Sequence, residues 1–530
     1  MRGSGLLRSN LVVTAGTFLS RVTGLLRFTT LAAVLGGTAL SDAYLVANET
    51  PNIVYDLLIG GVLSATLVPL FTSFAEQKDH ESEDVVVTTA VTAMFALTVV
   101  AVAAAPLIFG LFSVDVADDV DAGLFRQVGT TLARIFLVQI LFYGLTGLAN
   151  AFLNSRKRFF AAAWSPILPN LIIIATLLSL PDPAGGEWTL QDVLGDTRLR
   201  LTLGAGATLG IGAMALVLVP AAIRAGYRPR FRWNPKHPAS RKLLALSVWT
   251  LGFVASNIVA LTIVRNLTEP GSVRATAYII AFVFFMLPHG LLGVSIATTF
   301  QPDMARAVAQ RDKPAFINAA SLGIRMTALL TIPAGVGLFV LRRPLIGLAV
   351  EYGAFDPNDA LLASRALGGL ALGLGAFSVY LFVLRCFYAH QDTKTPFIVN
   401  IVENLINVVL AFSFVGAFGV LGLGAAYALA YSFVVFWVLQ ILGWKVPGFP
   451  MRTVLSSIWK MAVAAALMGE SVWFVTRNIG GNSGSDALLR VGVGAIVGFV
   501  VYGTLLLIMD APELNVLRQR FSRRAATAAQ

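Results

Sequence analysis

Long apolar segments separated by short polar ones run through the whole chain. About 20 mostly apolar residues are needed for a helix to cross a membrane, and fourteen segments have this length. They lie at approximately 11–35, 44–73, 85–112, 127–152, 160–180, 200–223, 243–267, 274–300, 316–341, 361–388, 395–416, 420–443, 454–476 and 488–509. The segments 160–180 and 395–416 are the shortest or most polar of the set. The pattern predicts an all-α polytopic membrane protein with about 14 transmembrane helices.

The first twelve predicted helices form an internal repeat. A shift of about 234 residues aligns Gly37 with Gly271 and, with one residue dropped, Pro69 with Pro302. We therefore expect two pseudo-repeated six-helix lobes followed by two C-terminal helices, an arrangement typical of transporters. The predicted divisions are an N-lobe at 1–223, a basic cytoplasmic linker loop at 224–242, a C-lobe at 243–443, and the last two helices with a basic tail at 444–530.

Composition and charge support a membrane protein and exclude other classes. Hydrophobic residues make up 57% of the chain and charged residues 13%, against about 25% charged residues in soluble proteins. The 39 Lys and Arg residues gather in short connections and the tail rather than in one nucleic-acid-binding patch. Their distribution predicts that both termini are cytoplasmic. The single cysteine, Cys386, lies in an apolar segment, which excludes a disulfide framework and a cysteine-based metal site.

The first two predicted helices carry five charged residues: Arg21, Arg27, Asp42, Glu49 and Asp56. Charges inside a membrane are costly and usually face a bundle interior or a water-filled cavity. A rise of 1.5 Å per residue places Arg21 level with Asp56 and Arg27 level with Glu49. These residues either form structural ion pairs, or the arginines bind an anionic substrate and the acids act as gate partners. Guanidinium binds phosphate in bidentate fashion, so the second explanation predicts a phosphate-bearing substrate.

Other polar residues inside apolar segments give weaker signals. Asn400, Glu403 and Asn404 lie at helical spacing. Their oxygen atoms are suitable ligands for a hard cation, although hydrogen bonds between helices are the favoured explanation. The acidic run DVADDVD at 115–121 lacks a partnered base and is typical of a solvated loop. We therefore expect no enzyme activity, no cofactor and no resident metal.

Several short motifs are shared with a known family. They are Ser20-Arg21 with Gly24 and Arg27, Asp42-Ala43 with Pro51-Asn52, and FYxxQDxKTP at 387–396. Through these motifs the chain resembles the MurJ/MviN family, the lipid II flippases of bacterial cell-wall synthesis in the MOP exporter superfamily. The last motif is the most specific of the set.

The resemblance implies two lobes around a cationic cavity for the diphosphate-sugar headgroup, and a groove for the polyprenyl tail at the last two helices. Arg21 and Arg27 match essential first-helix arginines of the family, and Asp42 matches its aspartate at the outer end. This chain departs from typical members by having Tyr55-Asp56 and Val283 where those members are basic.

The favoured hypothesis is a flippase that moves lipid II, the undecaprenyl-diphosphate-linked muropeptide, from the cytoplasmic to the outer face of the bacterial plasma membrane by alternating access. The implied partners are lipid II, membrane lipids and cell-wall synthesis proteins, and no nucleic acid. The alternatives are an exporter of another polyprenyl-linked glycan or of an amphipathic cation, and a non-transporting scaffold for cell-wall synthesis. Membrane potential, a proton on Asp56 and a cation near Glu403 stay open as energy sources.

Overall fold

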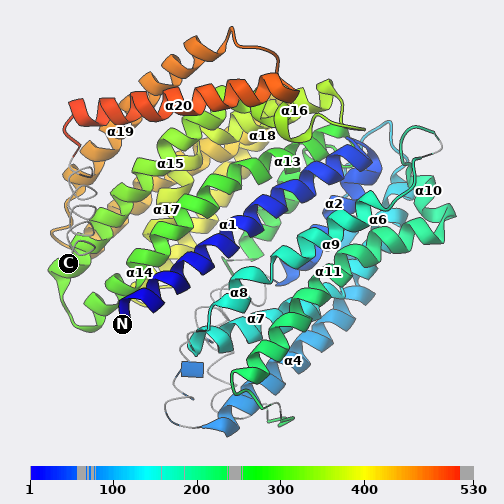
Figure 1. The fold of residues 1–530 in the computed structure, drawn as a ribbon, viewed down its shortest axis with the longest axis horizontal. Helices are drawn as coiled ribbons and strands as arrows, with labels where there is room; N and C mark the ends of the chain where they lie inside the picture. The colour runs from blue at the N-terminus through cyan, green and yellow to red at the C-terminus, as the bar shows by residue number, and fades with distance from the viewer. Residues whose placement is uncertain are drawn as a thin grey trace. The chain divides into compact units, whose positions relative to one another are not determined.

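The computed structural model describes residues 2–55, 67, 71–72, 74, 77, 79–156, 158–183, 185–228, 230–234, 237, 252–253, 255–511 and 513. Within these ranges the regular structure is helical (Figure 1). The chain divides into two compact units. Unit 1 contains Met1–Thr276 and Tyr352–Asp356, and unit 2 contains Ala277–Glu351 and Pro357–Gln530.

Apart from the short helix α10 (Leu190–Gly195), the helices of unit 1 follow the predicted apolar segments. They are α1 (Arg2–Leu35), α2 (Ala39–Tyr55), α4 (His80–Ala103), α5 (Ala105–Leu111), α6 (Ala122–Phe136), α7 (Gln139–Ser155), α8 (Phe160–Trp164), α9 (Ile167–Leu178), α10 (Leu190–Gly195) and α11 (Thr197–Arg224). Residues 255–266 are also helical. In this unit α11 packs against α7 and α9, and α1 packs against α8 and α9 (Figure 1).

Unit 2 continues with α13 (Val273–Pro288), which begins in unit 1, a π-helical turn η2 (His289–Gly293) and α14 (Val294–Ala309). The remaining helices are α15 (Lys313–Val350), α16 (Pro357–Ala371), α17 (Leu374–Ala389), α18 (Lys394–Lys445), α19 (Met451–Thr476) and α20 (Gly484–Ile508). The long helix α15 contacts α16, α17, α19 and α20 and is therefore central to this unit (Figure 1).

The predicted all-helical polytopic fold is confirmed. Ten helices in the described part of the chain are long and apolar enough to span a membrane, and the bent pair α16–α17 gives an eleventh. The predicted segment 361–388 matches this pair, which bends by 50°. The predicted segments 44–73 and 243–267 lie partly outside the described residues.

A single glycine divides α18 into two helical halves. Gly419 has φ 55° and ψ −136°, a conformation open to glycine and strongly disfavoured for residues with a Cβ atom. It separates the two predicted segments 395–416 and 420–443. The two ends of α18 meet, because Lys445 Nζ lies 2.6 Å from Asp392 Oδ2 at the helix start. The two halves of α18 therefore run in opposite directions.

Candidate substrate-binding site

Arg21 and Arg27 lie on α1, the first helix of unit 1. Arg21 is exposed and Arg27 is half-buried. The Arg27 guanidinium lies over the Phe28 ring, 4.8 Å from its centroid, and interacts electrostatically with Tyr44. The ion pairs of the described residues include neither arginine. Within that part of the chain, both guanidinium groups keep their hydrogen-bond donors available for an anion.

Asn170 of α9 fixes α1 at the level of Arg21. The Asn170 side-chain amide donates to the Ser20 carbonyl at 3.2 Å and to Thr23 Oγ1 at 3.1 Å. Both Asn170 and Thr23 are buried. Gly24 lies against the same amide, since a Cβ atom at this position would lie 3.6 Å from Asn170 Nδ2. These contacts surround the backbone of Arg21 and set its rotation about the helix axis.

Asp42, near the start of α2, is fully buried and is held by two groups from a distant part of the chain. Its Oδ1 forms an ion pair with Arg265, whose side chain is 7% exposed. Its Oδ2 accepts the Gly271 N–H at 2.8 Å. The Arg265 guanidinium also donates to the Ala275 carbonyl at 3.4 Å. Asp42 is thus joined to residues 265–275 of unit 1.

The other two acids predicted for this region have different positions. Glu49 is exposed on α2, and its predicted level with Arg27 stays a prediction. Asp56 lies outside the described residues, so its predicted level with Arg21 stays a prediction.

Asn400, Glu403 and Asn404 are buried together on α18 in unit 2, with exposed fractions of 1%, 1% and 8%. Asn404 Nδ2 donates to Asn400 Oδ1 at 3.2 Å. The Tyr431 hydroxyl lies beside the Glu403 carboxyl, yet neither carboxylate oxygen has hydrogen-bond geometry with a described residue. The described residues contain no cluster of three His, Cys, Asp or Glu side chains that would hold a metal. The cation-site hypothesis therefore rests on one carboxyl and two amides.

The match to a family model decides the family of the chain. Residues 31–488 match the family described as lipid II flippase MurJ. The chain belongs to this family. The resemblance inferred from the motifs is confirmed, and so is the expectation of a transport protein rather than an enzyme.

Individual MurJ relatives match over nearly the full length. The chain is 27% identical over 524 residues to a probable lipid II flippase MurJ of Haemophilus influenzae, covering 94% of this chain and 99% of that one. It is 27% identical to a probable lipid II flippase MurJ of Rhizobium meliloti, covering 99% and 97%.

Solved structures agree on the fold. A lipid II flippase MurJ in an inward closed conformation superposes with a TM-score of 0.75 at 22% identity, covering 94% of this chain and 99% of that one. An inward-facing multidrug resistance MATE transporter of the MOP superfamily reaches a TM-score of 0.63 at 14% identity, covering 81% and 95%. The fold is thus shared with MurJ and with more distant MOP transporters.

The most specific MurJ motif of this chain, at 387–396, forms the turn into α18. Asp392 accepts hydrogen bonds from the Thr395 N–H at 3.0 Å, from Thr395 Oγ1 at 2.7 Å and from Lys445 Nζ at 2.6 Å. Burial raises the pKa of Asp392, but the hydrogen bonds from Lys445 and Thr395 outweigh it, and the pKa lies below its ordinary value. This part of the MurJ motif therefore holds the two ends of α18 together.

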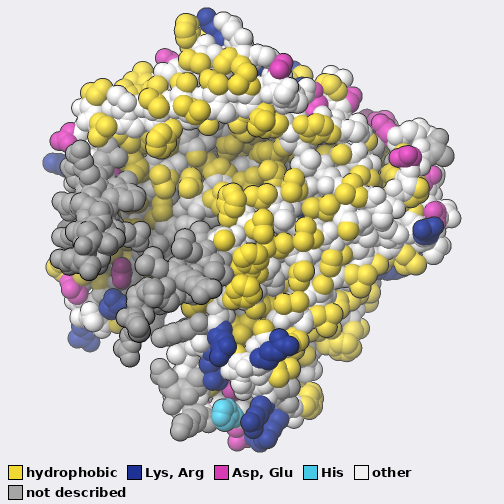
Figure 2. Space-filling view, in the orientation of Figure 1, with side chains coloured by type: hydrophobic (Ala, Val, Ile, Leu, Met, Phe, Trp, Pro, Cys, Tyr) yellow, Lys and Arg dark blue, Asp and Glu magenta, His cyan; other side chains and the backbone are white. Residues whose placement is uncertain are grey.

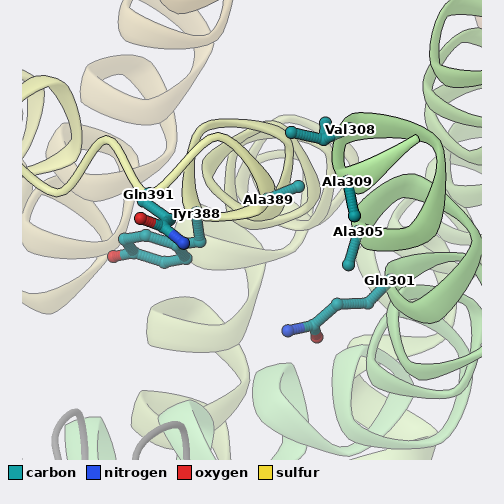
Figure 3. Close-up of a pocket in the computed structure, with 7 residues that line it drawn as sticks. All are labelled: Gln301, Ala305, Val308, Ala309, Tyr388, Ala389 and Gln391. Carbon is teal, nitrogen blue, oxygen red and sulfur yellow. The ribbon is translucent and has the colours of Figure 1, made fainter. Parts of the chain in front are cut away.

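A pocket of about 290 Å³ lies beside the same motif in unit 2 (Figure 3). It is lined by Gln301, Ala305, Val308, Ala309, Tyr388, Ala389 and Gln391. Arg385 donates to Gln301 at 3.2 Å. In Figure 3 the polar side chains of Gln301, Tyr388 and Gln391 come from α14 and from the end of α17. The pocket leaves no signal in the sequence, because its wall is mostly alanine and valine from two distant segments.

Arg265 and Asn170 are the site residues that sequence reasoning missed. Arg265 is 223 residues from its partner Asp42, so local spacing carries no signal for the pair. It also lies near the end of a predicted span, where an arginine commonly extends to the membrane surface. Asn170 lies in the predicted segment 160–180, and its place in the sequence does not reveal its contact with α1.

Proposed function

We propose that this chain carries lipid II from the cytoplasmic to the outer face of the bacterial plasma membrane by alternating access. Membership of the lipid II flippase MurJ family supports the cargo. The observation that carries the mechanism is the pair Arg21 and Arg27 on α1, which has no acidic partner among the described residues. A diphosphate is the ligand that two such guanidinium groups bind most strongly.

Orientation and partners belong to the same proposal. Lys and Arg residues are concentrated in the tail and in the connections that follow every second predicted helix. This distribution supports cytoplasmic termini. The multi-pass fold supports membrane lipids as partners. Cell-wall synthesis proteins are proposed as further partners because they make and consume the cargo.

The acids are proposed to serve the transport cycle rather than to bind cargo. Asp42 would hold α2 against residues 265–275 through Arg265 in one state of the cycle, and Asp56 and Glu49 would pair with the arginines of α1 when cargo is absent. The carboxyl of Glu403, with Asn400 and Asn404, would take a cation during transport. Its burial without a well-formed hydrogen bond supports this role.

The test is transport in cells depleted of their native flippase. We expect the intact chain to restore lipid II on the outer face. The Arg21→Ala, Arg27→Ala variant should lower transport about tenfold or more, since each charge-assisted hydrogen bond is worth roughly 1.5–3 kcal/mol. Arg198→Ala is the matched control, because Arg198 is exposed at the start of α11, outside the proposed site.

Two outcomes separate cargo from mechanism. No rescue by the intact chain, at a membrane level equal to that of the native flippase, would exclude lipid II as cargo. Full rescue by the double arginine variant would be compatible with lipid II as cargo but would exclude the two arginines as its binding groups.

A further inference from the structure

A short extended segment after α11 carries arginines interleaved with exposed aromatic side chains. Phe231 is 81% exposed and Trp233 is 51% exposed. Arg228, Arg230 and Arg232 are exposed beside them. We call these five residues the arginine–aromatic strip. Aromatic and basic side chains are both enriched at the interface between a membrane and water.

The strip is fixed to α4, so its position is defined. The Arg232 N–H donates to Thr88 Oγ1 at 3.0 Å, and Thr88 Oγ1 donates to the Arg230 carbonyl at 3.4 Å. The Arg232 guanidinium lies 3.0 Å from Glu81. Upstream, the Tyr227 ring packs on Phe152 of α7, with centroids 5.4 Å apart.

These contacts place the strip at the level of the membrane surface. The first five residues of α4, His80 to Asp84, are polar or charged, and the helix becomes apolar from Val85. Thr88 is one turn beyond that change, about 12 Å from the helix start. The strip therefore crosses α4 near the boundary between its charged end and its apolar body, where aromatic and basic side chains are favoured at a bilayer surface.

The neighbouring segment has the same composition. Arg158 is exposed, Phe159 is 42% exposed and Phe160 is 63% exposed. It follows α7, and Arg156 at the end of that helix lies 3.6 Å from Glu83 of α4. Figure 2 shows Lys and Arg side chains gathered at this end of unit 1, beyond the hydrophobic surface of its helices.

We infer that the arginine–aromatic strip binds anionic phospholipid of the adjacent leaflet. Phe231 and Trp233 enter the interface, and the arginines bind lipid phosphates. Arg232 is already paired with Glu81. Arg230 also interacts electrostatically with Asp84 of α4, so its charge is partly compensated. Arg228 and Arg230 are the arginines of the strip that have no ion pair to a described residue. A protein partner is the competing explanation, and the experiment distinguishes the two.

The test uses the full chain in nanodiscs of phosphatidylcholine doped with brominated lipid, which quenches nearby tryptophan. The chain has eight tryptophans, so the difference between the wild type and Trp233→Phe isolates Trp233. We expect brominated phosphatidylglycerol to quench Trp233 at least twofold more than brominated phosphatidylcholine at equal mole fraction. In Arg228→Gln, Arg230→Gln the two brominated lipids should quench Trp233 about equally, since two of the arginines that attract anionic headgroups are removed.

The controls keep the result interpretable. Arg228→Gln, Arg230→Gln leaves the Arg232–Glu81 pair intact, and an unchanged unfolding temperature verifies folding. Arg198→Gln, Arg200→Gln removes two arginines next to the other end of α11 and should leave the preference unchanged. No quenching of Trp233 by either lipid would overturn the inference and favour a protein partner. Equal quenching of the wild type by both lipids would overturn the selectivity for anionic headgroups.

Discussion

The Asp42 carboxylate and the Arg265 guanidinium form a buried ion pair across 223 residues of sequence. The Gly271 N–H donates to the second Asp42 oxygen, so both carboxylate oxygens are satisfied. A buried pair of this kind contributes less to net stability than to specificity, but losing one partner leaves an uncompensated charge. The pair thus defines one arrangement of α2 against residues 265–275.

Removal of one partner should be strongly destabilising. We expect Arg265→Met to lower the free energy of unfolding by about 3–5 kcal/mol, measured by thermal or denaturant unfolding in detergent. Asp42→Asn with Arg265→Met should recover most of this loss, because no buried charge remains. Glu269→Gln is the control. The ion pair between Glu269 and Arg274 is about half exposed, so its loss should lower the free energy of unfolding by less than about 1 kcal/mol. Equal effects at both pairs would contradict the buried role.

Transport should require Asn170, because its side chain forms hydrogen bonds that position α1. Asn170→Leu keeps the side-chain volume but loses the hydrogen bonds to Ser20 and Thr23. The loss should cost roughly 1–2 kcal/mol of stability and reduce transport by misorienting Arg21. Thr23→Val, which removes one of those bonds, should have a smaller effect on both measurements. Normal transport by Asn170→Leu in a stably folded protein would show that α1 does not need this contact.

Stability should depend on pH through Asp392. Its folded-state pKa is lowered, so the ionised form stabilises the fold above the unfolded pKa of about 4. This contribution should be lost as pH falls through the lower folded-state pKa. At pH 7 we expect Asp392→Asn to cost about 1 kcal/mol, because Lys445 is 49% exposed. Unfolding temperatures of wild type and Asp392→Asn should converge below about pH 4, and a constant difference down to pH 2 would contradict the assignment.

Glu403 should tolerate loss of its charge but not of its volume. Glu403→Gln keeps the shape and removes the cost of burying a carboxylate without a well-formed hydrogen bond. We expect its unfolding temperature to equal or exceed that of the wild type. Glu403→Ala should destabilise by roughly 2 kcal/mol or more through the cavity it leaves. A large loss with Gln would indicate a charged partner in the membrane, such as a bound cation.

The sequence predicts the helices well, because each membrane span needs a long apolar segment that is visible locally. It does not predict bends. The segment 361–388 is continuous in hydropathy, yet the chain turns by 50° between α16 and α17. Arg21 and Arg27 are identifiable because a charge in an apolar segment is anomalous by itself. Arg265 is not identifiable in this way, because its role depends on Asp42, which only the folded chain brings close.

The reversal of α18 at Gly419 determines how much of this polypeptide is accessible from outside the membrane. A continuous helix of 52 residues would be about 78 Å long, far more than a bilayer core of about 30 Å. The reversal at Gly419 lets the helix cross the bilayer twice, with one residue in place of a connecting loop. On the side of the membrane where Gly419 lies, the connection between the two halves therefore exposes almost no polypeptide to proteases or antibodies. The stretch Lys394–Lys445 should survive such digestion as one fragment.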